Sequence, residues 1–557
     1  MRNFVLTFTF LVAQAAAADW FGPVHIEPRR SFLSPQIGAY HEYRFAVVNP
    51  TAERHVIRIE VVSRTYYAAF GEIRSSREVV VSPRSSEVVS IPELVLGNYA
   101  GPATAFVKVD GRVQGKQFQI DRESGSGYNA RDILIGRSVP QPLVVELIPD
   151  WSVGDAVRLE LPPAEWSDQW IYYDRFEGML LTDMDWRQLP PDARAAILRW
   201  VSAGGALTFY GSAELPPVRP AVEITQLRAA HHGFGTISML GAGAPLDPNA
   251  IAEIQALWRG ALALPGGLSE NGNMQLLDKP PIPVGLLFLL LMAFAIIAGP
   301  IHLFVLAKKN RRIWMFVTLP VMSIAAATLI VGSVIANEGL VRIEKTTSLT
   351  LLDETLGEAT TLGWTGFYAT FPPNGQVRFD GATEAVPLFA VRDARTDWSD
   401  GQRLTSGWIR SRVPSHFAVR KVESRRERLR IRDEAGHLVA LNGLGSLVKQ
   451  LWVVGEDGAI YSAKEIAAGK EVVLAPTGER FDAGALQDPA LLFGSAPTWS
   501  SYYSRLTHEP RTVLRPGMYL AVLEKSPFVE TALEKPDDAK SEGVVIGLMS
   551  RSRAHAS

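Results

Sequence analysis

Asp183 and Asp185 are the first residues whose type and spacing suggest chemistry, because they follow a short apolar run at 178–182. Carboxylates beyond the C-terminal ends of parallel strands lie where α/β proteins bind their ligands, and their oxygens could hold a divalent cation. The alternative is turn chemistry, since aspartate favours the turn before a helix. We favour the turn interpretation and predict no metal site, while both aspartates stay candidates for facing a ligand.

Ser212 is a second candidate, because it follows the apolar run 206–210 as the serine of a nucleophile elbow would. The Gly-x-Ser-x-Gly pattern is not met, and Pro216-Pro217 leave no room for the helix that should follow. His231 and His232 are adjacent, so on a strand they would point to opposite faces and make a poor metal pair. The chain has no cysteine, which removes thiolate nucleophiles and zinc–sulfur sites. We therefore predict no catalytic residue, no cofactor and no metal.

The elements that position these residues form an α/β region at 130–265. A helix opens at Pro190-Pro191-Asp192 and stops at Ala203-Gly204-Gly205, between strand-like runs at 178–182 and 206–210. Strand, helix and strand in this order predict a βαβ unit with a parallel sheet. We predict further strands at 132–136, 143–147 and 233–240, and a helix at 249–262.

Three segments of this region resemble the class I glutamine amidotransferase-like domain: Phe176 to Leu181, Leu198 to Leu207, and Gly233 to Ile237. The sharpest part is Trp-Val-Ser-Ala-Gly-Gly at 200–205. The resemblance covers about 130–340. The similar domains are the degenerate versions found in bacterial inner-membrane proteins. The resemblance implies a flavodoxin-like α/β fold. Family catalysis requires a cysteine nucleophile and a His-x-Glu pair. Because this chain has no cysteine, the resemblance does not imply amidotransferase activity.

The chain also carries three apolar segments that are typical of an exported membrane protein. Residues 1–18 have the charged, apolar and small-residue order of a signal peptide, with cleavage after Ala18. Residues 283–307 and 313–336 are each about 24 residues long, enough to cross the hydrocarbon core. We expect a kink at Gly299-Pro300 in the first of these transmembrane helices.

The loop at 308–312 sets the predicted orientation. Its cations are Lys308, Lys309, Arg311 and Arg312, and a short loop with this charge stays cytoplasmic. The signal peptide sends the preceding region outward, so both large regions share the bacterial periplasm. His302, within the first helix, is either a proton relay or, as we favour, a neutral histidine that faces the interface.

Both flanking regions are predicted to be β-rich. Short alternating strands at 19–125 indicate an immunoglobulin-like β-sandwich with a hairpin at Asp110-Gly111. Residues 338–550 indicate one or two further β-sandwiches, followed by a disordered tail at 551–557. Within them we predict a hairpin loop at 455–458 and pairing of 518–523 with 544–549.

Together these features predict a non-catalytic, inner-membrane-anchored periplasmic scaffold or binding protein that belongs to an envelope complex. Its expected partners are the lipid bilayer and envelope proteins, with a glycan as a further candidate. A formal net charge of −2 without a long basic stripe argues against nucleic-acid binding. Two alternatives stay open: an envelope hydrolase that uses Asp183, Asp185 or Ser212, and an accessory subunit of a transporter.

Overall fold

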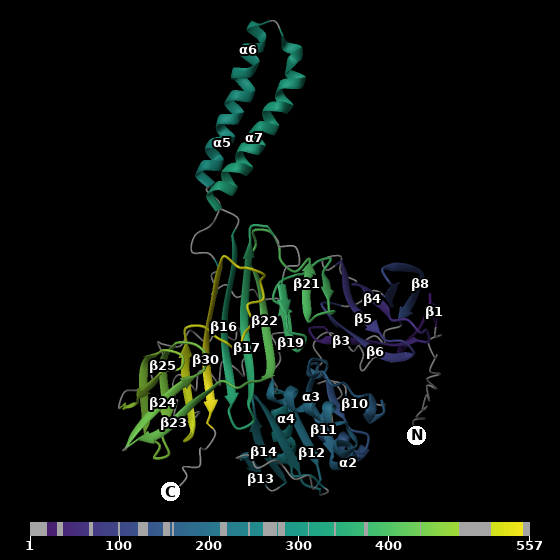
Figure 1. The fold of residues 1–557 in the computed structure, drawn as a ribbon, viewed down its shortest axis with the longest axis vertical. Helices are drawn as coiled ribbons and strands as arrows, with labels where there is room; N and C mark the ends of the chain where they lie inside the picture. Colours follow the sequence, from purple (N-terminus) through teal and green to yellow (C-terminus); the bar gives the residue numbers. More distant parts are fainter. Residues whose placement is uncertain are drawn as a thin grey trace, which may run out of the picture.

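The structure is a computed structural model of the 557-residue chain. It describes residues 19–29, 37–65, 71–97, 101–120, 132–148, 156–158, 161–211, 220–224, 226–242, 245–259, 274, 276, 284–309, 311–338, 341–371, 377–434, 436–477 and 514–549. The predicted signal peptide, Ser212 and the predicted tail lie outside the described residues. Two helices project from a broad body in which sheets and helices mix (Figure 1).

The N-terminal region folds into two β-sheets. The first sheet has the order β1 (Asp19–Phe21), β2 (Val24–Arg29), β3 (Tyr40–Asn49), β6 (Ser85–Leu94). The second has the order β18 (Val377–Phe379), β21 (Gln402–Ser406), β20 (Arg395–Asp397), β5 (Glu72–Val81), β4 (His55–Arg64), β7 (Ala103–Val109), β8 (Arg112–Ile120). The predicted hairpin at Asp110-Gly111 is confirmed, since β7 and β8 pair antiparallel around it.

Three strands of that second sheet come from far along the chain. β20 pairs in parallel with β5, with Arg395 opposite Arg74, and carries β21 and β18 with it. Alternation in β4 puts Ile57, Ile59 and Val61 in the core between the sheets. The N-terminal sandwich is therefore completed by β18, β20 and β21, which lie beyond the boundary at 125 that the local pattern suggests.

The α/β region has a seven-stranded sheet. Its order is β10 (Ala156–Arg158), β9 (Asp132–Ile135), β11 (Phe176–Thr182), β12 (Ala206–Tyr210), β15 (Gly235–Leu240), β14 (Leu227–His232), β13 (Pro220–Ile224). The first five strands are parallel and the last two antiparallel. Numbered along the chain, the parallel strands run 2-1-3-4-5, which is a doubly wound order. Helices α2 (Asp183–Gln188), α3 (Pro191–Ser202) and α4 (Pro248–Arg259) belong to this region.

The predicted strand at 143–147 is wrong, because this run belongs to helix α1 (Gln141–Leu147). Proline occupies the first helical turn, where its missing N–H breaks no bond. Leu143, Val144 and Leu147 are buried, whereas Val145 is 56% exposed. An apolar run this short cannot distinguish a strand from a one-sided helix by composition.

The C-terminal region is dominated by a nine-stranded sheet. Its order is β19 (Thr383–Pro387), β22 (Ser415–Ser424), β17 (Glu358–Ala369), β16 (Arg342–Asp353), β30 (Asp538–Leu548), β29 (Met518–Leu523), β25 (Val448–Val454), β26 (Ile460–Ile466), β28 (Ala475–Pro476). A small sheet adds β23 (Arg428–Glu434), β24 (His437–Gly443) and β27 (Glu471–Val473). The predicted β25–β26 hairpin and the β29–β30 pairing are confirmed.

The two projecting helices correspond to the predicted transmembrane segments. The first consists of α5 (Val284–Ile296), a π-helical turn η3 (Ile297–Ile301) and α6 (His302–Lys308); η4 (Arg312–Trp314) leads into the second, α7 (Met315–Glu338). The windows 288–308 and 312–332 have mean hydropathies of 2.5 and 2.1 and are not buried by the protein. Both helices are long and apolar enough to cross a membrane. The expected irregularity at Gly299-Pro300 takes the form of the π-helical turn, which relieves the missing proline N–H.

One hydrophobic core runs through all three folded regions. The same cluster of buried side chains contains Phe45 of the N-terminal sandwich, Trp200 of the α/β region and Phe417 of the C-terminal sheet. Such continuity argues against three modules on flexible linkers, because domains that move independently have separate cores.

Candidate functional site

Asp185 lies at the edge where ligands bind in doubly wound sheets, between the C-terminal ends of β9 and β11. Its carboxylate accepts hydrogen bonds from the Ser138 and Thr182 backbone N–H groups, at 2.9 and 3.0 Å, and from the Thr182 hydroxyl at 2.8 Å. The Thr182 hydroxyl accepts in turn from the Asp185 N–H, which completes a capping box for α2. A Cβ at Gly136 would overlap this carboxylate. Asp185 thus fastens the loop after β9 to the start of α2.

The other sequence candidates do not converge on Asp185 in the described structure. Asp183 is on the surface of α2, where Arg187 pairs with it at 2.8 Å one turn later. His231 and His232 are paired with Thr236 and Gly235 in the β14–β15 hairpin. Burial lowers the pKa of His232, which favours its neutral form. No group of three or more histidines and carboxylates with metal-binding geometry occurs among the residues that the structure describes.

The Trp-Val-Ser-Ala-Gly-Gly motif forms the corner between α3 and β12. Trp200 is 1% exposed, and its ring occupies the space that a Cβ at Gly205 would need. The corner accepts the tip of the β14–β15 hairpin: the Phe234 N–H donates to the Ser202 carbonyl at 2.9 Å, and a Cβ at Gly235 would overlap the carbonyl oxygens of Val201 and Gly205. The glycines therefore serve a backbone-to-backbone approach.

This corner, here named the docking corner (residues 200–205 and 232–235), contacts the C-terminal sheet. The Ser202 hydroxyl donates to Glu358 of β17 at 2.8 Å. Phe234 packs against the hydrophobic cluster that includes Leu349 and Leu362. The motif that most resembles an enzyme family thus lies at a boundary between two parts of the body.

Arg420 of β22 joins the same two parts from within the core. It is 1% exposed, its Nε lies 2.6 Å from Glu384 of β19, and its guanidinium also pairs with Asp174 of the α/β region. It donates to the Ala203 carbonyl at 3.1 Å and lies over the Trp170 ring, 5.4 Å from the ring centroid. Movement of one part against the other would separate this buried cation from its carboxylate partners, which is costly, so Arg420 opposes such movement.

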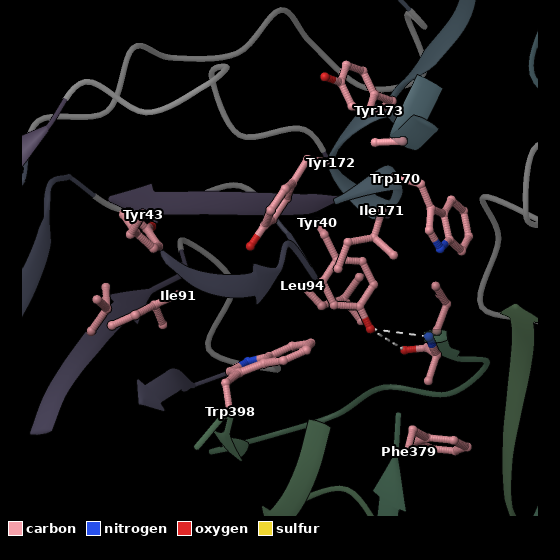
Figure 2. Packing of buried hydrophobic residues seen from close by; sticks show 14 of the residues in the cluster. Tyr40, Tyr43, Ile91, Leu94, Trp170, Ile171, Tyr172, Tyr173, Phe379 and Trp398 are labelled. Carbon is pink, nitrogen blue, oxygen red and sulfur yellow. Dashed lines mark hydrogen bonds between the residues drawn. The ribbon is translucent and has the colours of Figure 1, made fainter. Parts of the chain in front are cut away.

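The N-terminal sandwich meets the surroundings of Arg420 in a layer of aromatic side chains (Figure 2). The Tyr40 hydroxyl donates to the Ala385 carbonyl at 3.1 Å and accepts from Gln402 at 2.6 Å. Figure 2 shows Tyr40 beside Trp170 of η2 (Trp170–Tyr173) and Trp398. Burial raises the pKa of the Tyr40 hydroxyl, so that it stays protonated. We call Tyr40, Trp170, Glu384, Asp174 and Arg420 the junction; sequence reasoning missed it, since these residues lie far apart along the chain and show no motif.

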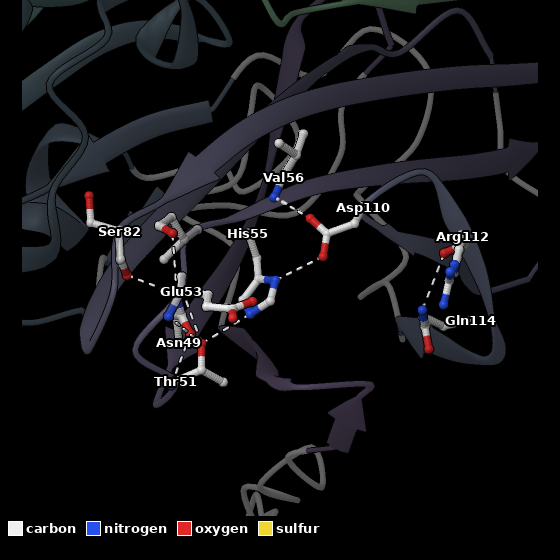
Figure 3. A network of polar contacts seen from close by, with 10 residues as sticks. Asn49, Thr51, Glu53, His55, Val56, Ser82, Asp110, Arg112 and Gln114 are labelled. Atoms are coloured by element: carbon white, nitrogen blue, oxygen red, sulfur yellow. Dashed lines mark hydrogen bonds and ion pairs between the residues drawn. The ribbon is translucent and has the colours of Figure 1, made fainter.

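An acid, an imidazole and a hydroxyl also align at one end of the N-terminal sandwich (Figure 3). His55 Nδ1 lies 2.8 Å from Asp110 Oδ2, and His55 Nε2 lies 3.0 Å from Thr51 Oγ1. The same Thr51 hydroxyl lies 2.7 Å from Asn49 Oδ1, and Asn49 bridges to three backbone carbonyls. These bonds tie the loop at 49–55 to the turn at Asp110. The arrangement resembles a catalytic triad in order only, because Thr51 is held by its own loop.

A polar contact joins the two helices of the hairpin. His302 Nε2 lies 2.9 Å from Thr318 Oγ1, whose hydroxyl donates to the Trp314 carbonyl at 2.9 Å. The imidazole therefore donates through Nε2 and connects α6 to α7. Lys308, Lys309, Arg311 and Arg312 lie at the turn, on the end of the hairpin that is remote from the sheets (Figure 1).

Comparison with known proteins gives no family. No family model and no curated protein matches the chain. Beta-glucosidase from Listeria innocua in complex with isofagomine aligns over 19% of this chain and 16% of that chain, at 10% identity and a TM-score of 0.14. The yeast delta-COP-I mu-homology domain complexed with a Dsl1 WxWxV peptide aligns over 38% of this chain and 96% of that chain, at 6% identity and a TM-score of 0.18. At such scores neither likeness defines the fold or the activity.

Proposed function

We propose that this chain is a non-catalytic scaffold or binding protein, anchored in the bacterial inner membrane with both large regions in the periplasm. One observation carries the proposal: the junction and the docking corner join sandwich, α/β region and C-terminal sheet through buried contacts, Arg420 with Asp174 and Glu384 foremost. A rigid body on a membrane hairpin presents fixed surfaces to partners. An enzyme that closes on its substrate would instead need parts that move.

The resemblance to a degenerate glutamine amidotransferase-like domain agrees with this proposal. The 2-1-3-4-5 strand order supports a flavodoxin-like assignment for residues 130–265. The motif residues pack closely at the docking corner, and the Asp185 carboxylate caps helix α2. We therefore assign these residues to assembly of the body.

The charge of the loop between the helices supports the orientation. Lys308, Lys309, Arg311 and Arg312 lie at the far end of the hairpin, whereas both large regions lie at its other end. Because short cationic loops stay cytoplasmic, the body belongs on the periplasmic side. The transporter-subunit alternative is less supported, since two helices with one histidine offer a poor pathway without a partner.

Single-cysteine labelling tests the orientation without background, because the chain has no cysteine. We would introduce Val113→Cys, Glu434→Cys and Asn310→Cys separately and add a membrane-impermeant maleimide to intact spheroplasts. Val113 is 67% exposed and the Glu434 side chain 53%. The first two sites should react and Asn310→Cys only after lysis. Reaction of Asn310→Cys in intact spheroplasts would reject the topology.

Cross-linking in intact cells, followed by capture of the tagged full chain, tests the scaffold itself. We expect defined envelope proteins to be recovered, and recovery of only the bare monomer would count against the proposal. The variant Asp183→Asn/Ser212→Ala tests the hydrolase alternative at two of its three candidate residues, since Asp185 already caps α2. A hydrolase that uses either residue would lose its biological activity in this variant, while a scaffold would keep both activity and partners.

A further inference from the structure

A small cavity of about 300 Å³ opens at the start of β16, the strand that follows the second apolar helix along the chain. Its walls are Val341, Arg342, Phe371, Lys535 and Asp537. These residues come from the start of β16, the segment after β17 and the turn before β30, so the cavity lies at the end of the sheet nearest the hairpin (Figure 1).

Hydrogen bonds hold these walls together. The Arg342 N–H donates to the Asp537 carboxylate at 2.8 Å, and the Asp537 N–H donates to the Arg342 carbonyl at 2.8 Å. The Arg342 guanidinium donates to the Glu534 carbonyl at 3.3 Å. Thr370, beside Phe371, accepts from the Val341 N–H at 3.2 Å. The cavity is therefore a built feature of the fold.

With α7 across the bilayer, the cavity lies at or just outside the lipid headgroup layer. Helix α7 has 24 residues and is about 36 Å long at the usual rise of an α-helix. The hydrocarbon core is about 30 Å thick and the headgroup layers add about 5–8 Å on each side. Glu338 therefore emerges among the headgroups, and Val341 follows three residues later.

The chemistry of the walls fits a phosphate diester. Arg342 and Lys535 provide two cations, and charge-assisted donation to phosphate is stronger than neutral hydrogen bonding. Asp537 provides an acceptor for a headgroup that ends in a donor. Phe371 is 53% exposed, as an aromatic side chain at the membrane interface commonly is.

We infer that this cavity binds the headgroup of a membrane phospholipid, with the phosphate on Arg342 and Lys535 and an ammonium group on Asp537. The inference rests on the proposed membrane anchoring. Phosphatidylethanolamine carries both groups and is the expected ligand. Bound lipid would connect β16 to the turn at 534–537 and set the height of the body above the bilayer.

The test compares the full chain with Arg342→Gln/Lys535→Gln, purified in mild detergent and titrated with phosphatidylethanolamine under native mass spectrometry. We expect about a tenfold loss of lipid occupancy in the variant, since each lost charge-assisted contact weakens binding severalfold. The matched control is Arg430→Gln/Lys464→Gln, which removes the same charges from exposed positions on strands β23 and β26. The control should bind lipid as the natural chain does.

Three outcomes would overturn the inference. Arg342→Gln/Lys535→Gln would keep the lipid occupancy of the natural chain, the control would lose as much lipid as that variant, or excess inorganic phosphate would displace the lipid equally from the natural chain and from the variant. The thermal unfolding midpoint of each variant reports whether it is folded. Phe371→Ala changes no polar residue of the cavity wall. It should weaken lipid binding less than Arg342→Gln/Lys535→Gln does. Carbonate extraction of the same membranes separates the two proposals: protein that washes off rejects the anchoring, whereas protein that stays but binds lipid equally rejects only the cavity.

Discussion

Arg420 and Glu384 form an ion pair inside the protein, with Arg420 Nε 2.6 Å from Glu384 Oε2 and side chains that are 1% and 0% exposed. Asp174 approaches the same guanidinium from the α/β region. Burial of three charged groups is expensive, and it is compensated only when all of them are paired. The pair therefore works as an orientation constraint between the C-terminal sheet and the α/β region.

Removal of this cation should destabilise the protein strongly. In Arg420→Leu, Asp174 and Glu384 would be left buried without their partner, and we expect a loss of about 3–5 kcal/mol of unfolding free energy. Urea denaturation in detergent measures it. The control is Arg432→Leu, whose side chain is 53% exposed in pairs with Glu434 and Glu471 and should contribute about 0–1 kcal/mol. An equal loss of unfolding free energy in both variants would show that the buried ion pairs of the junction stabilise the protein no more than an exposed pair does.

The docking corner should not tolerate a methyl group at Gly235. A Cβ there would overlap the backbone oxygens of Val201 and Gly205, which cannot move as a flexible side chain would. Gly235→Ala should therefore lose at least about 2 kcal/mol. Gly115→Ala is the matched control, because nothing lies within 4 Å of its Cβ position. Limited proteolysis should cut Gly235→Ala faster; an unchanged cleavage rate would contradict the tight approach.

The two aspartates of α2 should respond differently to alanine. Asp185→Ala removes the capping box and leaves the Ser138 N–H without its acceptor, so we expect a loss of about 1–2 kcal/mol. Asp183→Ala removes an exposed pair with Arg187 and should lose no more than about 0.5 kcal/mol. Thermal denaturation of both variants gives the comparison. A larger loss of stability in Asp183→Ala would contradict the assignment of Asp185 as the capping residue.

Glu344 should make stability depend on pH. Burial raises the pKa of its carboxyl from 4.5 to about 7, and the nearby Glu530 charge also raises it. The Ala532 and Leu533 N–H groups, both at 2.9 Å, act in the opposite direction. The folded state therefore holds this proton more tightly than the unfolded state. Stability from this group is complete below pH 4.5 and is lost as the pH rises through 7, by about 3 kcal/mol in all.

Glu344→Gln isolates this contribution, because the amide does not titrate. As the pH rises from 4.5 to 7, the unfolding free energy of the natural chain should decrease relative to that of the variant. Above pH 7 the difference should stay constant. Lys421, which pairs with Glu530 at 2.6 Å, is unchanged in both proteins and so cancels. A pH-independent difference would contradict the raised pKa.

Elements with strong local patterns could be predicted from the sequence. The two apolar helices follow from length and hydropathy, the β25–β26 hairpin from its turn at 455–458, and the βαβ unit around α3 from its proline start and glycine end. The prediction of a strand at 143–147 was wrong because the buried side of a helix and a short buried strand can have the same composition.

Contacts between distant segments could not be predicted in the same way. The parallel pairing of β20 with β5 and of β30 with β16 depends on tertiary packing, and one sequence carries no local signal for it. The same holds for Arg420, which reads as an ordinary strand residue until its three partners are in place. For the candidate site, sequence reasoning found Asp185 but could not show that Ser138 and Thr182 already occupy its carboxylate.

The pairing of Arg74 with Arg395 has a consequence for how the protein is made. A ribosome finishes the first eight strands long before β20 is synthesised, and the two apolar helices are made in between. During this interval one edge of β5 offers unpaired N–H and carbonyl groups, which are a template for wrong pairing. A chain arrested before residue 395 should therefore be more prone to aggregation than the complete chain.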